Sequence, residues 1–237
     1  MKRTTTLWLL ALLVLASCSS PSEKQALYEI SEFYGGSVRL SSGRNFSTSG
    51  EEPQGHYLAV ALDKPGLNRH FADLKLPASN CAYLAFSNLK PAERADYDFV
   101  KVTLKDSAST HAYSFSQADL TQALAAGEDL RTLIFNIQGS DYVAAANNFN
   151  PDALDTIPRD SLTSIMYRLG TRINPFTEYR IHGFALVREP VGSKPLPLVR
   201  LFVSVPRPPE PDHHLLFVIN PALSDAEHFL YGMNVIN

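Results

Sequence analysis

Residues 160–170 read Asp-Ser-Leu-Thr-Ser-Ile-Met-Tyr-Arg-Leu-Gly, and this stretch, together with residues 171–219, decides the fold class. Its apolar residues recur at the spacing of one helical face; they are Leu162, Ile165, Met166 and Leu169. Three apolar stretches come next, at about 178–188, 198–205 and 213–219, with no helical pattern between them. The C-terminal half therefore reads as a helix followed by three strands. This order predicts an α+β fold with an antiparallel sheet packed against helices.

Earlier in the chain, the patterns predict a mixture of short helices and strands. The expected elements are a helix at about 22–34, an exposed loop at 41–55, a strand at 57–62, a helical stretch at 70–89, strands at 98–105 and 113–115, a helix at 116–127 and a strand at 130–137. We expect a capping box from Ser22 to Gln25 at the start of the first helix. The proline-rich residues 206–212 predict a stiff connection between the last two strands.

Length and composition bound the class of protein. The chain has 237 residues, of which 45% are hydrophobic and 19% charged, so it can bury a full core and is not a disordered tail. A formal net charge of -3 gives no electrostatic reason to bind nucleic acid, and two cysteines exclude a disulfide framework. We expect one globular region over 22–237, with two subdomains at 22–137 and 150–237 as the other possible division.

The N-terminus has the pattern of an export signal. Basic residues at positions 2 and 3 precede nine consecutive apolar residues, from Leu7 to Leu15. A transmembrane helix needs about 20 apolar residues, so this run fits the apolar region of a signal peptide instead. The run ends in Leu15-Ala16-Ser17-Cys18. This tetrapeptide resembles the lipobox of bacterial lipoproteins, and the resemblance covers only the first tenth of the chain.

The resemblance implies where the mature protein begins and how it is held. Residues 1–17 would be the signal peptide, and residues 18–21 the lipidated N-terminus and a short tether. The thiol of Cys18 would carry a diacylglyceryl group, so that its acyl chains anchor the protein in a membrane. Position 19 is serine rather than the aspartate that usually retains such proteins at the inner membrane, which points to the outer membrane. The alternative is an ordinary secretory signal with a cysteine near its cleavage site.

Residues for catalysis are not evident in the sequence. The common motifs of hydrolases, metalloenzymes and nucleotide-binding proteins are missing, so no catalytic, cofactor-binding or metal-binding residue can be named, and no cofactor is expected. Cys81 lies in an apolar stretch and is interpreted as a buried core residue rather than a nucleophile. His213 and His214 are neighbours on a predicted strand, so they point to opposite faces and cannot chelate one ion. The adjacent carboxylates at 51–52 and 128–129 are interpreted as solvated loop charge.

The charge distribution is uneven in the C-terminal half. Residues 159–207 carry a net charge of +5, and residues 208–237 carry -4. Four arginines could form a patch for an anionic ligand or an acidic partner; they are Arg168, Arg172, Arg180 and Arg200. The plainer interpretation is that they complement a helix dipole and cover an outer sheet face.

Strand alternation makes a more detailed prediction about these arginines. It places Arg180 and His182 on one face with Phe184 and Leu186. It places Arg200 opposite the apolar residues Val199, Leu201, Val203 and Val205.

Two classes of function remain open on the sequence alone. The first is a lipid-anchored, non-enzymatic envelope protein with a binding or assembly role, whose partners are the membrane, through its lipid, and an envelope protein or an anionic ligand. The second is a lipid-anchored envelope hydrolase without a recognisable motif. A deep pocket containing His, Asp and Glu would favour the hydrolase, and a shallow arginine-bearing sheet face would favour binding.

Overall fold

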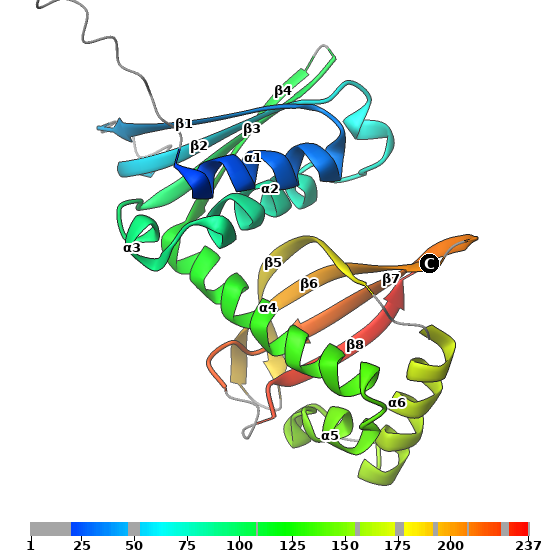
Figure 1. Ribbon diagram of the computed structural model, residues 1–237. Coiled ribbons are helices and arrows are strands. Elements are labelled where there is room, and N and C mark those ends of the chain that lie inside the picture. Colours follow the sequence, from blue (N-terminus) through cyan, green and yellow to red (C-terminus); the bar gives the residue numbers. More distant parts are fainter. Residues whose placement is uncertain are drawn as a thin grey trace, which may run out of the picture.

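The computed structural model describes residues 20–46, 53–107, 109–154, 157–173, 178–191, 194–207, 209–223 and 228–236. These residues form a mixed α+β structure, which confirms the predicted class (Figure 1). The helices are α1 (Pro21–Tyr34), α2 (Lys75–Asn88), α3 (Pro91–Arg94), α4 (Gln117–Gln138), α5 (Tyr142–Asn147) and α6 (Arg159–Ile173), with 3-10 turns at Leu67–Arg69 and Pro151–Ala153. The strands are β1 (Ser37–Asn45), β2 (Gly55–Asp63), β3 (Phe99–Asp106), β4 (Ser109–Ser116), β5 (Arg180–Val191), β6 (Lys194–Arg207), β7 (Glu210–Ile219) and β8 (Leu230–Ile236).

The first sheet has the order β1-β2-β3-β4. Its central strands β2 and β3 run parallel, with Leu58 opposite Val100, so this sheet departs from the antiparallel arrangement that the sequence predicts. The reason is the long connection through α2, which returns the chain to the same end of the sheet and allows a parallel crossover. The predicted loop at 41–55 is also wrong in its first part, because residues 41–45 belong to β1 and pair with β2. An edge strand can be polar, because its ladder hydrogen bonds do not require apolar side chains.

The second sheet is an antiparallel meander with the order β5-β6-β7-β8. The expected helix followed by three strands is corrected in two ways. A fourth strand, β8, pairs with β7, and its glycine at position 232 obscures the strand pattern in the sequence. The helices that pack on this sheet are α2, against β5, and α4, against β6 and β7, whereas α6 packs mainly against α5 (Figure 1). Residues 206–212 are also not a separate connection, because Arg207 pairs with Glu210 and the two strands extend into the proline-rich segment.

Helix α4 includes the residues for which a strand was predicted. Residues 130–137 form its second half, so the predicted strand is wrong. The buried residues there are Leu130, Leu133, Ile134 and Ile137, whose spacing fits a helical face as well as a short apolar strand. Gly127 lies inside this helix and does not end it, and a side chain at this position would clash with the hydroxyl of Tyr83. The carboxylates at 128–129 consequently lie on a helix and not in a loop.

Helix α1 confirms the predicted helix at 22–34 but begins one residue earlier. Its N-cap is Ser20, whose Oγ accepts from the backbone N–H of Glu23 at 3.2 Å, while Glu23 Oε2 accepts from Ser20 N at 2.9 Å. The expected capping box from Ser22 to Gln25 is therefore wrong. Pro21 explains the shift, because proline suits the first position of a helix, where its missing N–H is not needed.

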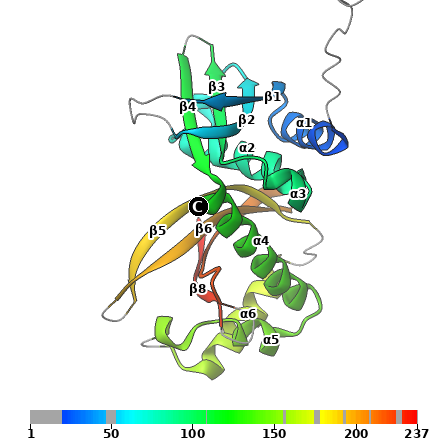
Figure 2. The same ribbon diagram turned by 90° about the vertical axis from the view of Figure 1, so that its left-hand side faces the viewer.

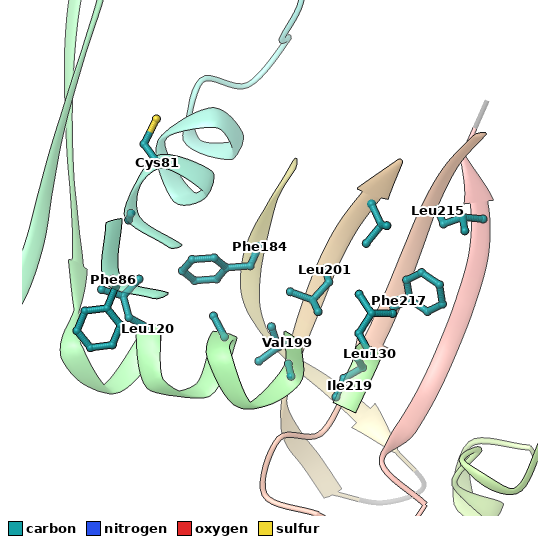
Figure 3. Close-up of a cluster of buried hydrophobic side chains, with 14 of the residues drawn as sticks. Cys81, Phe86, Leu120, Leu130, Phe184, Val199, Leu201, Leu215, Phe217 and Ile219 are labelled. Atoms are coloured by element: carbon teal, nitrogen blue, oxygen red, sulfur yellow. The ribbon is translucent and has the colours of Figure 1, made fainter. Parts of the chain in front are cut away.

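Helix α2 lies between the two sheets, and the buried core is continuous from one sheet to the other (Figures 1 and 2). Its first turn contains Pro77, and its buried side includes Cys81 and Phe86. Figure 3 shows Phe184 and Leu201 of the second sheet directed toward the α2 and α4 side of this core. None of the helices built from the described residues has the length and apolar character needed to cross a membrane.

Candidate functional site

A hollow of about 410 Å³ opens where α1, α2 and the start of β5 meet. We call it the junction hollow. Its lining residues are Glu29, Glu32 and Phe33 of α1, Tyr83 and Leu84 of α2, and Glu178, Tyr179, Arg180 and Ile181 at the start of β5. A volume of several hundred Å³ is within the range of ligand-binding sites in proteins.

The helical period explains which side chains reach this hollow. On α1, Ile30 and Tyr34 are buried in the core, so Glu29 and Phe33 lie on the neighbouring face. On α2, most of the surface is covered by the two sheets. Tyr83 and Leu84 remain half-buried and form the base of the hollow. The hollow is therefore apolar and aromatic inside and acidic where it meets solvent.

The carboxylates of the junction hollow differ in their partners. Glu29 accepts hydrogen bonds from the amide groups of Gln25, at 2.9 Å, and Asn88, at 2.7 Å. Glu178 forms an ion pair with Arg180, with 2.9 Å between Oε1 and Nε. Glu32 is exposed, and no described residue forms an ion pair with it. Three glutamates against one arginine give the lining an excess of negative charge.

Two tyrosines give the hollow neutral polar groups beside its apolar base. Burial raises the pKa of Tyr83 to about 12, and the nearby Tyr179 and Glu128 contribute to this rise. Burial also raises the pKa of Tyr179. Both phenols therefore stay protonated at neutral pH, so their rings and hydroxyls are available for contacts that do not involve a phenolate.

A second hollow, of about 520 Å³, lies on the other side of Tyr83, between α2, α3 and α4. We call it the α4 hollow. Its lining residues are Tyr83, Phe86, Ser87, Pro91, Arg94, Ala95, Gln117, Thr121, Leu124, Ala125 and Glu128. Arg94 is already engaged, because it donates to the carbonyls of Phe86, at 2.9 Å, and Ser87, at 2.7 Å, near the end of α2. Glu128 forms an ion pair with Arg131 of the same helix.

A serine and a histidine contact each other on the second sheet. His182 Nε2 lies 2.7 Å from Ser204 Oγ, and the His182 ring packs edge-on against Phe33 with 5.0 Å between centroids. Burial lowers the pKa of His182 to about 4; His214 and Arg180 also act to lower it, while Asp212 raises it. Ser204 is buried near the end of β6, which pairs with β5 and β7. The pair therefore has the distance of a nucleophile and its base, but not an exposed hydroxyl.

The four candidate arginines do not form one patch. Arg180 and Arg200 share a face of the second sheet, since Arg180 is opposite Ser204 and Ser204 is four residues from Arg200. Each is paired with a carboxylate: Arg180 with Glu178, and Arg200 with Glu189 at 2.7 Å. Arg168 lies exposed on α6, and its Nε donates to Ser164 O at 3.4 Å. Arg172 is in the last turn of α6, and its side chain is outside the described part.

A β-bulge changes the predicted faces of β5. The register shifts between Ile181 and Gly183, so Phe184 turns into the core while His182 faces Ser204. The prediction that Arg180 and His182 share a face with Phe184 is therefore wrong. The prediction for Arg200 is confirmed, because the four apolar residues that alternate with it are buried; they are Val199, Leu201, Val203 and Val205.

The other residues considered for a functional role are the two cysteines, the acidic pair at 51–52 and any group of metal ligands. Cys18 and the carboxylates at 51–52 lie outside the described residues. Cys81 is buried, as expected, and burial raises the pKa of its thiol far above the usual range, so its lack of reactivity stays a prediction. Within the described ranges, no three His, Cys, Asp or Glu side chains are grouped so that they could hold a metal ion.

Comparison with known proteins assigns neither a family nor a function to this chain. No family model, no curated protein and no solved structure matches this chain. A functional proposal therefore depends on the geometry of the two hollows and on the N-terminal sequence. The sequence patterns do not single out Glu29, Glu32, Tyr83 or Tyr179, because an acidic helix face and scattered tyrosines are common. Only the docking of β5 beside α1 and α2 brings them together.

Proposed function

We propose that this protein is a lipid-anchored, non-enzymatic protein of the bacterial cell envelope, with a binding or assembly role. The anchor is the acylated Cys18, and the membrane is the outer membrane, with the folded body facing the periplasm. The binding site is the junction hollow. The observation that carries the binding role is its combination of an apolar, aromatic base with carboxylates at the rim.

The N-terminal sequence supports the anchored state. Leu15-Ala16-Ser17-Cys18 follows an apolar run of the length that signal peptides have. Helix α1 begins at Pro21, so only two residues separate the lipidated cysteine from this helix. At 1.5 Å per residue, Glu29 to Phe33 lie about 12–18 Å along the helix from Pro21. In the anchored protein, the junction hollow is therefore held close to the membrane surface.

A binding role agrees better with the arrangement of polar groups than hydrolysis does. The Ser204–His182 contact lies outside the lining of both hollows. The backbone of Ser204 lies within the paired strands, so its own N–H does not form an oxyanion hole. The junction hollow has instead the features of a recognition site, with rings, aliphatic side chains and a few carboxylates.

The anchor is tested by replacing its acyl acceptor. Wild type and Cys18→Ala are expressed in a bacterium supplied with labelled palmitate, and the protein is then partitioned between detergent and water. We expect the wild type to carry label and enter the detergent phase, because two or more acyl chains give stable anchoring. Cys18→Ala is expected to lose both properties.

Cys81→Ala is the matched control, since it removes the other cysteine and is expected to keep the label. Label on Cys18→Ala, or unlabelled wild type in the aqueous phase, would overturn the proposed anchor. Separation of inner from outer membranes by density then tests the proposed location.

A further inference from the structure

We propose that the junction hollow and the α4 hollow together bind an extended basic segment of a partner protein, with an arginine or lysine side chain among Glu29, Glu32 and Glu178. This inference deepens the proposed binding role and rests on it. Three features of the molecule support it: the charge of the lining, the nature of its base and the position of the second hollow.

The charge of the junction hollow selects a cation. Arg180 neutralises Glu178, whereas the hydrogen bonds to Glu29 come from amides, which leave its negative charge in place. Glu32 has no ion-pair partner among the described residues. Among the described residues, neither of these two carboxylates of the hollow forms an ion pair. A cationic group gains Coulomb energy there, while an anionic ligand would be repelled.

The base of the hollow selects a cation on an aliphatic stem. Phe33, Tyr83, Leu84, Tyr179 and Ile181 present rings and aliphatic groups. Lysine and arginine pack their methylene groups against such surfaces and keep the charged end in a polar environment. The face of an aromatic ring also attracts a nearby cation. Both tyrosines stay neutral at physiological pH, because burial raises the pKa of each.

The α4 hollow indicates a polypeptide rather than a small amine. It continues the binding surface beyond Tyr83, which lines both hollows. Ser87, Gln117 and Thr121 contribute side-chain oxygens to it, and these can accept hydrogen bonds from backbone N–H groups. A ligand that occupies both hollows needs a basic side chain at one point and a hydrogen-bonding backbone on either side, which an extended peptide provides.

The test is a binding measurement with defined peptides. The full chain is immobilised through a C-terminal tag, so that binding does not depend on the anchor, and is exposed to Gly-Ser-Leu-Arg-Leu-Arg-Ser-Gly in surface plasmon resonance at physiological salt. The matched probe has citrulline in place of both arginines, which keeps the shape and removes the charge. We expect the arginine peptide to bind about tenfold more tightly, because its charge meets two carboxylates that form no ion pair with the described residues.

Two variants locate the effect, and a third serves as their control. Glu32→Gln removes an exposed carboxylate of the hollow and is expected to reduce the preference for arginine to about threefold or less. Leu84→Arg places a cationic side chain at the base of the hollow and is expected to abolish binding of the arginine peptide. Asp152→Asn, the control, removes an exposed carboxylate near α5, away from both hollows, and is expected to leave the preference unchanged.

The outcomes separate this inference from the proposed function. Equal affinity for the two peptides, or an equal effect of Glu32→Gln and Asp152→Asn, would overturn the inference. Displacement of the arginine peptide by an equal concentration of spermidine would also overturn it, since a small amine would then be sufficient. Any of these results together with labelled Cys18 would leave the anchored state intact and remove only the peptide ligand.

Discussion

Gly183 joins β5 to α2 through a contact that has no space for a side chain. Its φ of +150° is rarely adopted by other residues, and a Cβ would lie 2.5 Å from Leu76 O and 2.6 Å from Ser79 Oγ. The next residue, Phe184, donates its backbone N–H to Ser79 Oγ at 2.9 Å. This contact fixes the β-bulge, and the bulge in turn directs His182 toward Ser204 and Phe33. Gly183 thus lies beside the point where His182 turns toward Phe33 of α1.

We expect Gly183→Ala to lower the free energy of unfolding by about 2 kcal/mol or more. The added methyl group would lie too close to the backbone carbonyl of Leu76, which cannot move aside without disturbing α2. Gly232→Ala is the matched control. A Cβ at Gly232 would meet only side-chain atoms of Val218, the nearest at 3.4 Å, so its effect should stay within about 1 kcal/mol. Chemical denaturation measures both variants. Equal losses would contradict the importance of this contact.

His182 makes stability depend on pH. Its pKa is lowered from 6.5 to about 4, first by burial, so the folded protein disfavours the charged imidazole. Between these two values the unfolded chain binds the proton more readily. The free energy of unfolding should therefore be fully maintained above about pH 7 and should fall as the pH falls toward 4.

The measurement is denaturation at several pH values for wild type and His182→Gln. Glutamine keeps a group that can bond to Ser204 but does not titrate, so the variant should lose part of the pH dependence. His111→Gln, at an exposed position on β4, is the matched variant. If the wild type and His182→Gln lost stability in parallel down to pH 4, the assigned pKa would be wrong.

Among the elements, α4 connects the two sheets, because its first turn follows β4 and its apolar side covers β6 and β7. Leu130 is fully buried and lies near Val199 and Ile219 in Figure 3, while Phe135 on the same helix is 71% exposed.

We expect Leu130→Ala to cost about 2–5 kcal/mol of unfolding free energy, since it leaves a cavity. Phe135→Ala should cost less than about 1 kcal/mol. A thermal melt of both variants checks the difference, and a larger loss for Phe135→Ala would contradict the placement of α4.

The elements predicted correctly are those with a strong local period. Helix α1 and strands β2 and β3 show clear alternation or helical spacing, and their burial follows it. Strand β1 could not be predicted, because as an edge strand it needs no apolar face. The second half of α4 is predicted wrongly because its four apolar positions fit two periods, and only packing against the second sheet decides between them.

At the scale of the whole molecule, the candidate site depends on contacts between distant segments. The junction hollow is lined by residues from three segments, at 29–33, 83–84 and 178–181. No pattern in the sequence indicates that these segments meet. The sequence predicts the sheet face of Arg200 correctly, because β6 alternates regularly around it. It predicts wrongly that His182 shares a face with Phe184, because the β-bulge between them shifts the alternation. The lipobox-like tetrapeptide, in contrast, is a local pattern, so the sequence alone predicts an anchor, while the fold is needed to locate the proposed binding site.

The central claim is that the junction hollow contacts a partner in the envelope. Site-specific photocrosslinking in the living bacterium tests it most directly, with a photoreactive amino acid placed at Leu84, in the hollow, or at Val143, exposed on α5. We predict a discrete crosslinked product from Leu84 that is weakened by Glu32→Lys, and none from Val143. No product at Leu84, or the same product from both positions, would contradict the claim.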